Sequence, residues 1–273
     1  MFFTKMQGIG NDFIVINNLE SKLLYDYSKL SEYLCNRNFG IGADGVLFIE
    51  NSKDADFKMK IFNSDGTEAE MCGNGIRCFA KYLYDNKISD KNEVFIETLA
   101  GIKEVKLILE GKKILLVQVN MGKPCFDYEK IPVLYTKNED VIKIEDKEVY
   151  PISMGNPHVV CFVEKVQDID IEKYGPLIEN YKYFPNKTNV EFVEILDKNK
   201  IKVRVWERGV GETLACGTGA CAAAVISYLK KGLDNKINVN LKGGSLKIEY
   251  NKVNDFVSLE GEAEKIFEGK IDT

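Results

Sequence analysis

The sequence of 273 residues lacks several features that would define common functional classes. It contains one histidine and no Cys-x-x-Cys pair, so we do not expect a structural zinc site or any other bound metal. No apolar run approaches about 18 residues, so no membrane-spanning helix is expected. The net charge is −5, from 37 Lys and Arg against 42 Asp and Glu, so the chain has no basic footprint for nucleic acid. The glycine loop at residues 39–45 lacks the Gly-Lys-Ser/Thr ending of a phosphate-binding loop.

The chain contains seven cysteines, an odd number. We expect no export signal, because the apolar N-terminal segment reaches Gly8 too soon for a signal peptide. These two features predict a protein of the reducing cytoplasm with free thiols. Two cysteines, Cys72 and Cys216, lie in glycine-rich motifs. The other five are expected to behave as small buried hydrophobes: Cys35, Cys78, Cys125, Cys161 and Cys221.

The stretch 71–78, Met-Cys-Gly-Asn-Gly-Ile-Arg-Cys, predicts a helix that begins directly after Cys72. Apolar residues follow at helical spacing, and Gly73 and Gly75 leave the first backbone N–H groups of the helix accessible to an anion. A cysteine at this end lies in the positive field of the helix dipole. We therefore expect the pKa of the thiol to fall from about 8.5 to between about 3.5 and 7.5.

The same motif occurs a second time. Ala-Cys-Gly-Thr-Gly-Ala-Cys at 215–221 opens another predicted helix, which the stop signals Lys230, Lys231 and Gly232 end. Cys216 lies 144 positions after Cys72. Either copy alone would be weak evidence for chemistry, because a Cys-Gly-x-Gly turn is usually only the start of a helix.

The repeat extends well beyond the two helices. Asn63 and Glu207 each lie nine residues before their cysteine, and the apolar segments 46–50 and 190–194 correspond at the same offset. Gly10–Asn11 corresponds to Gly155–Asn156. We interpret the chain as two halves of similar architecture, 1–117 and 118–262, with the tail 263–273 returning to the first half. A cleft between two such halves is the default position for an active site.

Alternation and turn signals predict the remaining elements. We expect a hairpin around Glu145–Asp146 in the polar segment 126–150, and a helix that is broken at Gly175–Pro176. Strands are expected at 2–7, 12–17, 57–62, 93–98, 102–109, 113–120, 158–164, 189–195, 201–206, within 236–250 and at 256–260, with a short helix at 28–36.

Two cysteines that face one carbon atom could invert a stereocentre. One thiolate removes a proton as general base, and the thiol on the other side returns a proton to the opposite face. A carboxylate on that carbon can bind the N–H groups at the two helix starts, which also stabilise the charge that develops as the proton leaves. Such a reaction does not require an organic cofactor.

The motifs together resemble the diaminopimelate epimerase family over essentially the whole chain. The matching residues are Gly8–Phe13, Asn63–Gly66, Met71–Cys78, Gly155–His158, Glu207–Gly209 and Ala215–Gly219. The resemblance implies an α+β fold of two pseudo-symmetric halves, each a mostly antiparallel, barrel-like sheet wrapped around a central helix. It also implies a homodimer and cofactor-independent interconversion of LL- and meso-diaminopimelate, in the synthesis of lysine and peptidoglycan precursors.

Carried over position by position, the resemblance makes Cys72 and Cys216 the catalytic acid and base, supported by His158 and Glu207. Gly45 departs from the pattern, because some members of the family carry a side-chain amide there; one substrate contact is therefore missing or replaced. The substrate contacts implied are Asn11, Asn63, Gly73, Asn74, Asn156, Asn189, Glu207, Arg208, Gly217 and Thr218.

Three other functions remain open on the sequence. A proline or hydroxyproline racemase of the same architecture would also use two cysteines, although the asparagines and Arg208 favour a longer substrate with a second charged end. A thiol redox protein could use Cys72 and Cys216 as a switching disulfide. A binding module could keep the fold without the chemistry, which the presence of both cysteines disfavours.

Overall fold

The computed structural model describes residues 1–21, 25–135 and 140–272, and the chain forms two compact units. Unit 1 consists of Met1–Asn120 with Glu260–Thr273, and unit 2 of Met121–Leu259. The end of the predicted returning tail, residue 273, and part of the uncertain segment 126–150, residues 136–139, lie outside the described residues.

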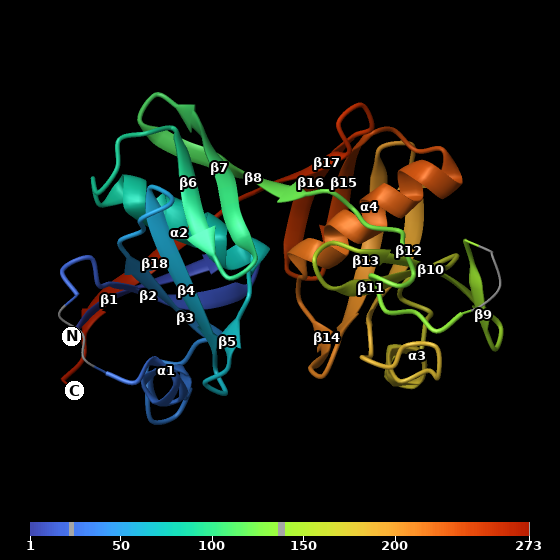
Figure 1. Cartoon of the computed structure of the whole chain (residues 1–273), viewed down its shortest axis with the longest axis horizontal. Coiled ribbons are helices and arrows are strands. Elements are labelled where there is room, and N and C mark those ends of the chain that lie inside the picture. The colour runs from blue at the N-terminus through green and yellow to red at the C-terminus, as the bar shows by residue number, and fades with distance from the viewer. Residues whose placement is uncertain (22–24, 136–139, 273) are drawn as a thin grey trace. The chain divides into compact units, whose positions relative to one another are not determined.

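The elements of unit 1 are labelled in Figure 1. They are β1 (Phe2–Gly8), β2 (Asn11–Asn17), α1 (Tyr27–Cys35), β3 (Gly45–Glu50), β4 (Phe57–Asn63), β5 (Glu68–Ala69), α2 (Gly73–Asp85), β6 (Glu93–Thr98), β7 (Gly101–Glu110), β8 (Lys113–Gly122) and β18 (Glu264–Lys270).

Unit 2 follows from the end of β8. Its elements are β9 (Ile142–Ile144), β10 (Lys147–Ser153), β11 (Pro157–Phe162), α3 (Ile171–Glu179), β12 (Asn189–Asp197), β13 (Lys200–Glu207), β14 (Gly211–Thr213), α4 (Gly217–Lys231), β15 (Lys236–Leu241), β16 (Gly244–Asn251) and β17 (Phe256–Gly261).

Strand pairing confirms the internal repeat. In unit 1, β1–β2 and β3–β4 are antiparallel, whereas β2–β3 and β4–β6 are parallel. In unit 2, β10–β11 and β12–β13 are antiparallel, whereas β11–β12 and β13–β15 are parallel. Helices α1 and α3 occupy equivalent places in the order, as do α2 and α4. The registers align Phe13 and Gly45 of unit 1 with His158 and Asn189 of unit 2.

Each sheet curves around one central helix, which confirms the predicted fold class (Figure 1). Helix α2 contacts β1, β2, β3, β4, β7 and β18 and buries Ile76, Phe79 and Leu83, whose spacing places them on one face. Helix α4 contacts β10, β11, β12, β13, β15 and β16, and its alanine-rich segment 220–226 is buried throughout. It ends at Gly232 in the left-handed conformation, as the stop signals predict.

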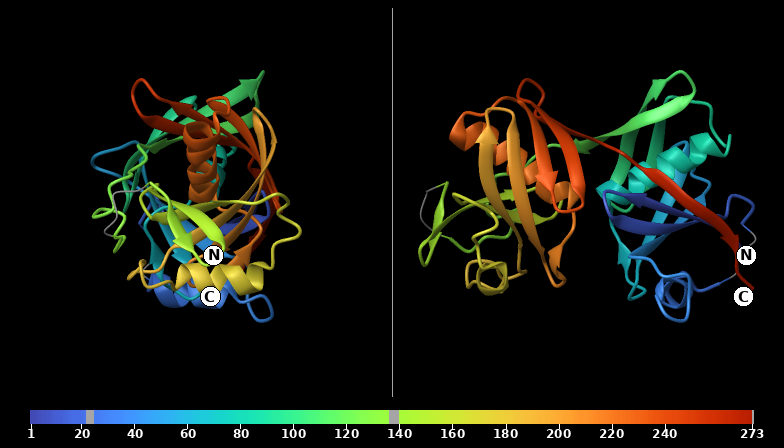
Figure 2. Two further views of the ribbon diagram at one scale, coloured as in Figure 1. Left: turned by 90° about the vertical axis from the view of Figure 1, so that its right-hand side faces the viewer. Right: turned by 180° about the vertical axis from the view of Figure 1, so that it is seen from behind.

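Both termini belong to unit 1 and lie beside each other in two views of the chain (Figure 2). Strand β18 pairs antiparallel with β1, and the Met1 amino group donates a hydrogen bond to the Ile271 carbonyl at 2.6 Å. The C-terminal segment therefore completes the sheet of unit 1 rather than that of unit 2.

The predicted break at Gly175–Pro176 is wrong, because α3 continues through both residues. Gly175 has no Cβ to collide with the proline ring that follows it, which removes part of the usual steric penalty on the residue before proline. It also lies against the Trp206 indole, where a Cβ would come within 2.4 Å of a ring carbon. Packing of the helix on β13 thus maintains a conformation that the local sequence disfavours.

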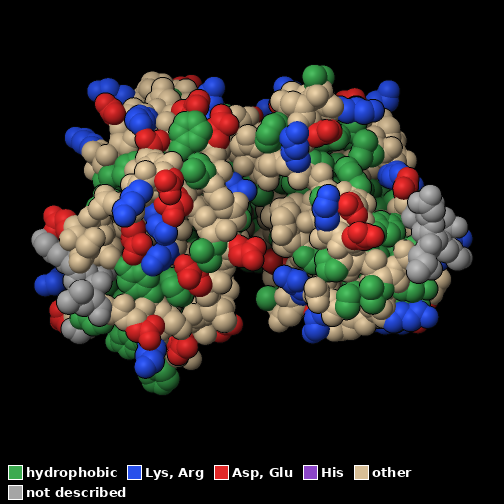
Figure 3. Space-filling view, in the orientation of Figure 1, with side chains coloured by type: hydrophobic (Ala, Val, Ile, Leu, Met, Phe, Trp, Pro, Cys, Tyr) green, Lys and Arg blue, Asp and Glu red, His purple; other side chains and the backbone are tan. Residues whose placement is uncertain are grey.

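The predicted hairpin at Glu145–Asp146 is confirmed, since β9 and β10 pair antiparallel across it. Within the described ranges no helix is long and apolar enough to cross a membrane. Lys, Arg, Asp and Glu side chains are interspersed on the face of each unit that Figure 3 shows.

Candidate active site

Cys72 is the N-cap residue of α2, with an extended backbone (φ −138°, ψ 120°). Its sulfur accepts a hydrogen bond from the Gly75 N–H at 3.4 Å and so takes the capping role that a serine or aspartate usually has. By helix geometry, the N–H groups of Gly73 and Asn74 have no acceptor within the helix. The thiol and these two donors therefore share the positive end of α2.

Two asparagines lie next to Cys72. Its thiol is 3.7 Å from Asn11 Oδ1, and Asn74 Nδ2 donates to the same oxygen at 3.3 Å. Asn74 is buried, at 2% exposure, and among the described residues its own Oδ1 has no hydrogen-bond partner. We call Cys72, Asn11 and Asn74 the Cys72 cluster; it presents amide groups around the sulfur.

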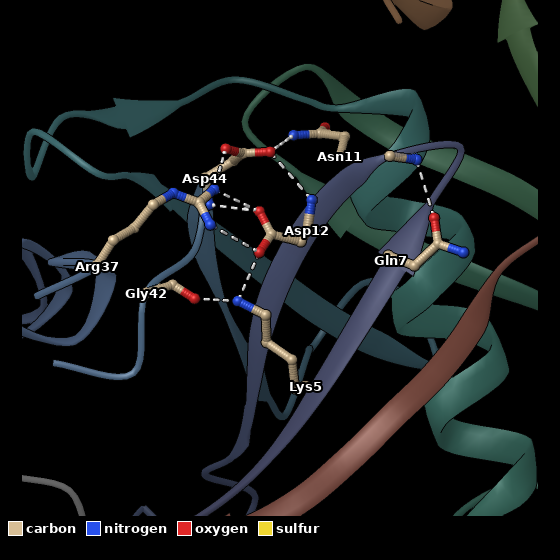
Figure 4. Close-up of polar contacts among 8 residues, drawn as sticks. Lys5, Gln7, Asn11, Asp12, Arg37, Gly42 and Asp44 are labelled. Atoms are coloured by element: carbon tan, nitrogen blue, oxygen red, sulfur yellow. Dashed lines mark hydrogen bonds and ion pairs between the residues drawn. The ribbon is translucent and has the colours of Figure 1, made fainter. Parts of the chain in front are cut away.

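A charged network orients Asn11 (Figure 4). Asp44 Oδ2 accepts from Asn11 Nδ2 at 2.7 Å and from the Asp12 N–H at 3.0 Å, and Arg37 donates to both carboxylates at 2.9 Å. Lys5 pairs with Asp12 at 2.7 Å. Burial by itself would raise the pKa of Asp12, but the hydrogen bonds from Arg37 and Lys5 outweigh it and lower the pKa to about 2. Because a carboxylate only accepts hydrogen bonds, Asp44 fixes the amide with its oxygen toward Cys72.

Two further positions of unit 1 were singled out in the sequence, Asn63 as a substrate contact and Gly45 as a departure from the family pattern. Asn63, at the end of β4, is exposed and donates to Thr67 Oγ1 at 3.0 Å. Gly45 pairs with it across β3 and β4, and a Cβ there would lie 2.7 Å from the Phe62 carbonyl oxygen. The backbone thus leaves no room for a side chain at position 45, which accounts for the missing amide.

Cys216 is the N-cap residue of α4 in the same extended conformation (φ −126°, ψ 118°). Its sulfur accepts from the Gly219 N–H at 3.4 Å and lies 3.4 Å from Thr218 Oγ1. The residue is only 7% exposed. The structure therefore repeats at Cys216 the cysteine cap found at Cys72.

Glu207 and His158 both lie in the surroundings of Cys216. Glu207 lies close enough to Cys216 to place its charge beside the thiol, and it accepts from Thr213 Oγ1 at 2.6 Å; burial raises the pKa of the Glu207 carboxyl group. His158 is fully buried, with Nδ1 2.7 Å from Glu191 Oε1 and Nε2 2.9 Å from Asn156 Oδ1. We call these residues the Cys216 cluster: Cys216, Thr218, Glu207, His158, Glu191 and Asn156.

The pKa of the Cys216 thiol is not lowered, although this residue begins a helix as Cys72 does. Its pKa is raised well above the ordinary value, first because the thiol is buried and then because Glu207 and Glu191 place negative charge beside it. The hydrogen bonds from Thr218 and Gly219 act in the opposite direction but are smaller effects. Burial and two carboxylates therefore outweigh the helix dipole, and Cys216 is held as the thiol.

Asn189 and Arg208 lie at the neighbouring strand ends of unit 2. The Asn189 amide is buried, donates to the Pro157 carbonyl at 2.8 Å and accepts from the Arg208 N–H at 2.9 Å. The Arg208 guanidinium is exposed and donates to the Asn186 carbonyl at 3.2 Å. Asn189 thus holds the loop that presents Arg208, while the guanidinium retains donors for a ligand.

Four of the remaining cysteines, Cys35, Cys78, Cys161 and Cys221, are buried as predicted, whereas the prediction is wrong for Cys125, which is only half-buried. All seven cysteines are described and are free thiols. Burial raises the pKa of Cys35, Cys78 and Cys161 to about 12 in each case. Over the described residues, no group of His, Cys, Asp and Glu side chains has the arrangement of a metal site.

Sequence reasoning missed two acidic residues: Glu191 of the Cys216 cluster, and Asp44, which orients Asn11 of the Cys72 cluster. A signal for Glu191 exists in the repeat: it is the one charged residue within the buried segment 189–193, and its counterpart at the same offset is Leu47. Asp44 gives no comparable signal, because its turn position suits an aspartate for purely local reasons.

Solved structures of other proteins share the fold of this chain. It superposes on a PhzF-family phenazine biosynthesis protein from Bacillus anthracis with a TM-score of 0.73 and 17% identity, covering 100% of this chain and 99% of the other. A probable proline racemase from Agrobacterium radiobacter gives a TM-score of 0.71 and 13% identity, covering 99% and 92%. At these identities the likeness concerns the fold alone.

Sequence comparison defines the family. The diaminopimelate epimerase family model matches residues 3–126 and 150–266. Curated relatives named diaminopimelate epimerase include those from Methanococcus maripaludis, 48% identical over the full length of both chains, and from Agathobacter rectalis, 49% identical over 100% of this chain and 99% of the relative. The chain belongs to the diaminopimelate epimerase family.

Proposed function

We propose that this protein interconverts LL- and meso-diaminopimelate by a two-base mechanism in which Cys72 and Cys216 exchange a proton with one α-carbon. The observation that carries the proposal is the duplicated cap: each unit presents one cysteine at the start of its central helix. Inversion needs a proton acceptor on one face of the carbon and a proton donor on the other. The two cysteine N-caps, one in each unit, supply the proton acceptor and the proton donor.

The protonation of Cys216 suggests how one direction begins. Since burial and two carboxylates hold Cys216 as the thiol, it is the group that delivers a proton, and Cys72 is then the base that removes one. In the reverse direction the roles exchange, because the proton that Cys72 has taken is the one it returns. When Cys72 carries the negative charge, the hydrogen bond from the Gly75 N–H and the positive end of α2 stabilise it.

The remaining residues recognise the substrate in this proposal. The substrate α-carboxylate binds the N–H groups of Gly73, Asn74, Gly217 and Thr218, which also stabilise the charge that develops on it when the α-proton leaves. Arg208 binds the distal carboxylate, and amide oxygens accept from the distal ammonium. Asn11, Asn63, Asn156, Asn189 and Glu207 complete the substrate contacts.

The experiment is proton NMR of LL-diaminopimelate in D₂O with reduced protein and no added pyridoxal phosphate. Deuterium at one α-carbon together with conversion to the meso isomer is the expected result. Exchange of proline in place of diaminopimelate would retain the two-thiol chemistry and overturn the substrate. If neither compound exchanged its α-proton, the proposal would be overturned. A separate assay in which the protein transferred electrons only when an oxidant was added would then favour a redox protein.

Two further expectations belong to this proposal. The protein acts in the cytoplasm, where its thiols stay reduced, and it works as a homodimer. Sedimentation equilibrium of the reduced protein tests the second expectation, because a 30.9 kDa species would contradict it.

A further inference from the structure

The internal repeat allows the two clusters to be compared position by position. The strand registers place Phe13 of β2 and His158 of β11 at equivalent points, and the offset of the repeat equates Leu47 of β3 with Glu191 of β12. In unit 1 this neighbouring pair is Phe and Leu, both buried. In unit 2 the same backbone positions hold a histidine and a carboxylate.

The contacts of Leu47 and Glu191 with the central helices are also equivalent. A Cβ added to Gly75, in the first turn of α2, would meet the Leu47 side chain at 3.2 Å. A Cβ added to Gly219, the counterpart in α4, would meet Glu191 Oε1 at 2.6 Å. Glu191 therefore packs against α4 at the position where the apolar side chain of Leu47 packs against α2.

The polar pair is costly where it lies. His158 and Glu191 are both 0% exposed, and Glu191 Oε2 has no hydrogen-bond partner among the described residues. Removing charged or polar groups from water is unfavourable, and a buried ion pair is often no more stabilising than well-packed apolar residues of similar volume. Because unit 1 builds the same fold with Phe13 and Leu47, the fold does not require the pair, and its retention in the Cys216 cluster requires another explanation.

We propose that Glu191 is a positioning residue of the Cys216 cluster: its carboxylate accepts the Nδ1 proton of His158 and thereby directs ring nitrogen Nε2 to Asn156. The inference rests on the proposed function, in which Asn156 contacts the substrate. A carboxylate at 2.7 Å can only accept, so Nδ1 carries a proton and the ring cannot rotate without losing that hydrogen bond. With the ring fixed, Nε2 donates to the Asn156 amide oxygen Oδ1 at 2.9 Å, and the Asn156 side chain keeps one orientation. Glu191 acts on the reaction through His158 and Asn156 and does not itself touch the substrate.

The first test uses the fact that His158 is the only histidine in the sequence. In protein labelled with ¹⁵N-histidine, the ring signals report this residue alone, whether or not the enzyme acts on diaminopimelate. We expect a proton on Nδ1, besides the one that Nε2 donates to Asn156, in the wild type at neutral pH, and loss of the Nδ1 proton in Glu191→Leu. A wild-type ring protonated on Nε2 alone, or an Nδ1 proton retained in Glu191→Leu, would overturn the proposal.

The second test compares three variants in the diaminopimelate assay. Glu191→Leu should lower kcat/KM by about tenfold to a hundredfold, since misplacement of a positioned group by about 1 Å can cost that much. Glu191→Gln should recover most of the activity, because its amide oxygen can still accept the Nδ1 proton. Glu212→Gln is the matched control: it removes a carboxylate four residues before Cys216 that pairs with Arg204, and it should leave the histidine spectrum unchanged.

The double variant His158→Phe/Glu191→Leu copies the pair of unit 1 into unit 2. We expect it to fold with wild-type stability and to have a kcat/KM no higher than that of Glu191→Leu. Wild-type activity in the double variant, or its failure to fold, would overturn the proposal, since the pair would then be dispensable or structural. If the wild type does not act on diaminopimelate, the proposed function fails, while the NMR experiment still decides the role of Glu191.

Discussion

The replacement of Gly219 and of Gly75 by alanine tests whether different side chains pack against the starts of α4 and α2. The quantity measured is the stability of each variant. The two glycines occupy the same position in α4 and in α2, and each donates its N–H to the capping cysteine. Alanine favours a helix over glycine by up to about 1 kcal/mol, so helix propensity alone predicts a small gain at both sites. What differs is the neighbour that the new methyl group meets.

At Gly219 the methyl group would meet Glu191 Oε1 at 2.6 Å. If Glu191 stays in place, overpacking costs about 1–3 kcal/mol. If it moves away, the charge-assisted hydrogen bond to His158 is lost, which costs about 1.5–3 kcal/mol. After the helix gain is subtracted, we expect Gly219→Ala to lower the free energy of unfolding by about 1–2 kcal/mol.

At Gly75 the nearest atoms are the methyl ends of Leu47 and Ile61 at 3.2 and 3.3 Å, which can shift by a few tenths of an ångström. The helix gain then roughly offsets the packing cost, and we expect Gly75→Ala to lie within about 1 kcal/mol of the wild type. Thermal unfolding of the reduced protein measures both, with a fall in Tm of about 2–8 °C expected for Gly219→Ala. Equal stability of the two variants would refute the placement of Glu191 against α4.

Three further predictions concern the clusters. Arg208→Ala should raise KM for diaminopimelate about tenfold, the loss of one hydrogen bond to a charged group, and an unchanged KM would remove its role in binding the distal carboxylate. Asp44→Ala should lower kcat/KM about tenfold or more, because the Asn11 amide is no longer held with its oxygen toward the sulfur; steady-state kinetics with unaltered circular dichroism is the check. Because Glu207 raises the pKa of Cys216, Glu207→Gln should shift iodoacetamide labelling of Cys216 to lower pH, and mass spectrometry showing a shift to higher pH would contradict this sign.

Local sequence predicted the elements that depend on local physics. The glycines after each cysteine, together with helical spacing of apolar residues, located the starts of α2 and α4, and Gly232 located the end of α4. The internal repeat predicted the equivalence of the units, and the strand pairings bear it out. These features are visible in one sequence because each depends on residues that are close together or repeated at one offset.

The features that the sequence did not predict depend on burial and on distant neighbours. The pKa of Cys216 is raised although the residue lies at the positive end of α4, because Cys216 is only 7% exposed and lies near Glu191 of β12 and Glu207 of β13. The Gly175–Pro176 break failed for the same reason, because packing on Trp206 maintains the helix. Neither the tertiary packing nor the desolvation of a group can be read from local spacing.

The central claim is that both cysteines exchange protons with one carbon, and the variants Cys72→Ala and Cys216→Ala test it directly. Each is assayed by NMR for conversion of LL-diaminopimelate to the meso isomer in D₂O, with circular dichroism and thermal unfolding as controls for the fold. We expect neither folded variant to interconvert the isomers, because each lacks the proton donor or acceptor on one face. Wild-type conversion by either variant would contradict the two-base mechanism.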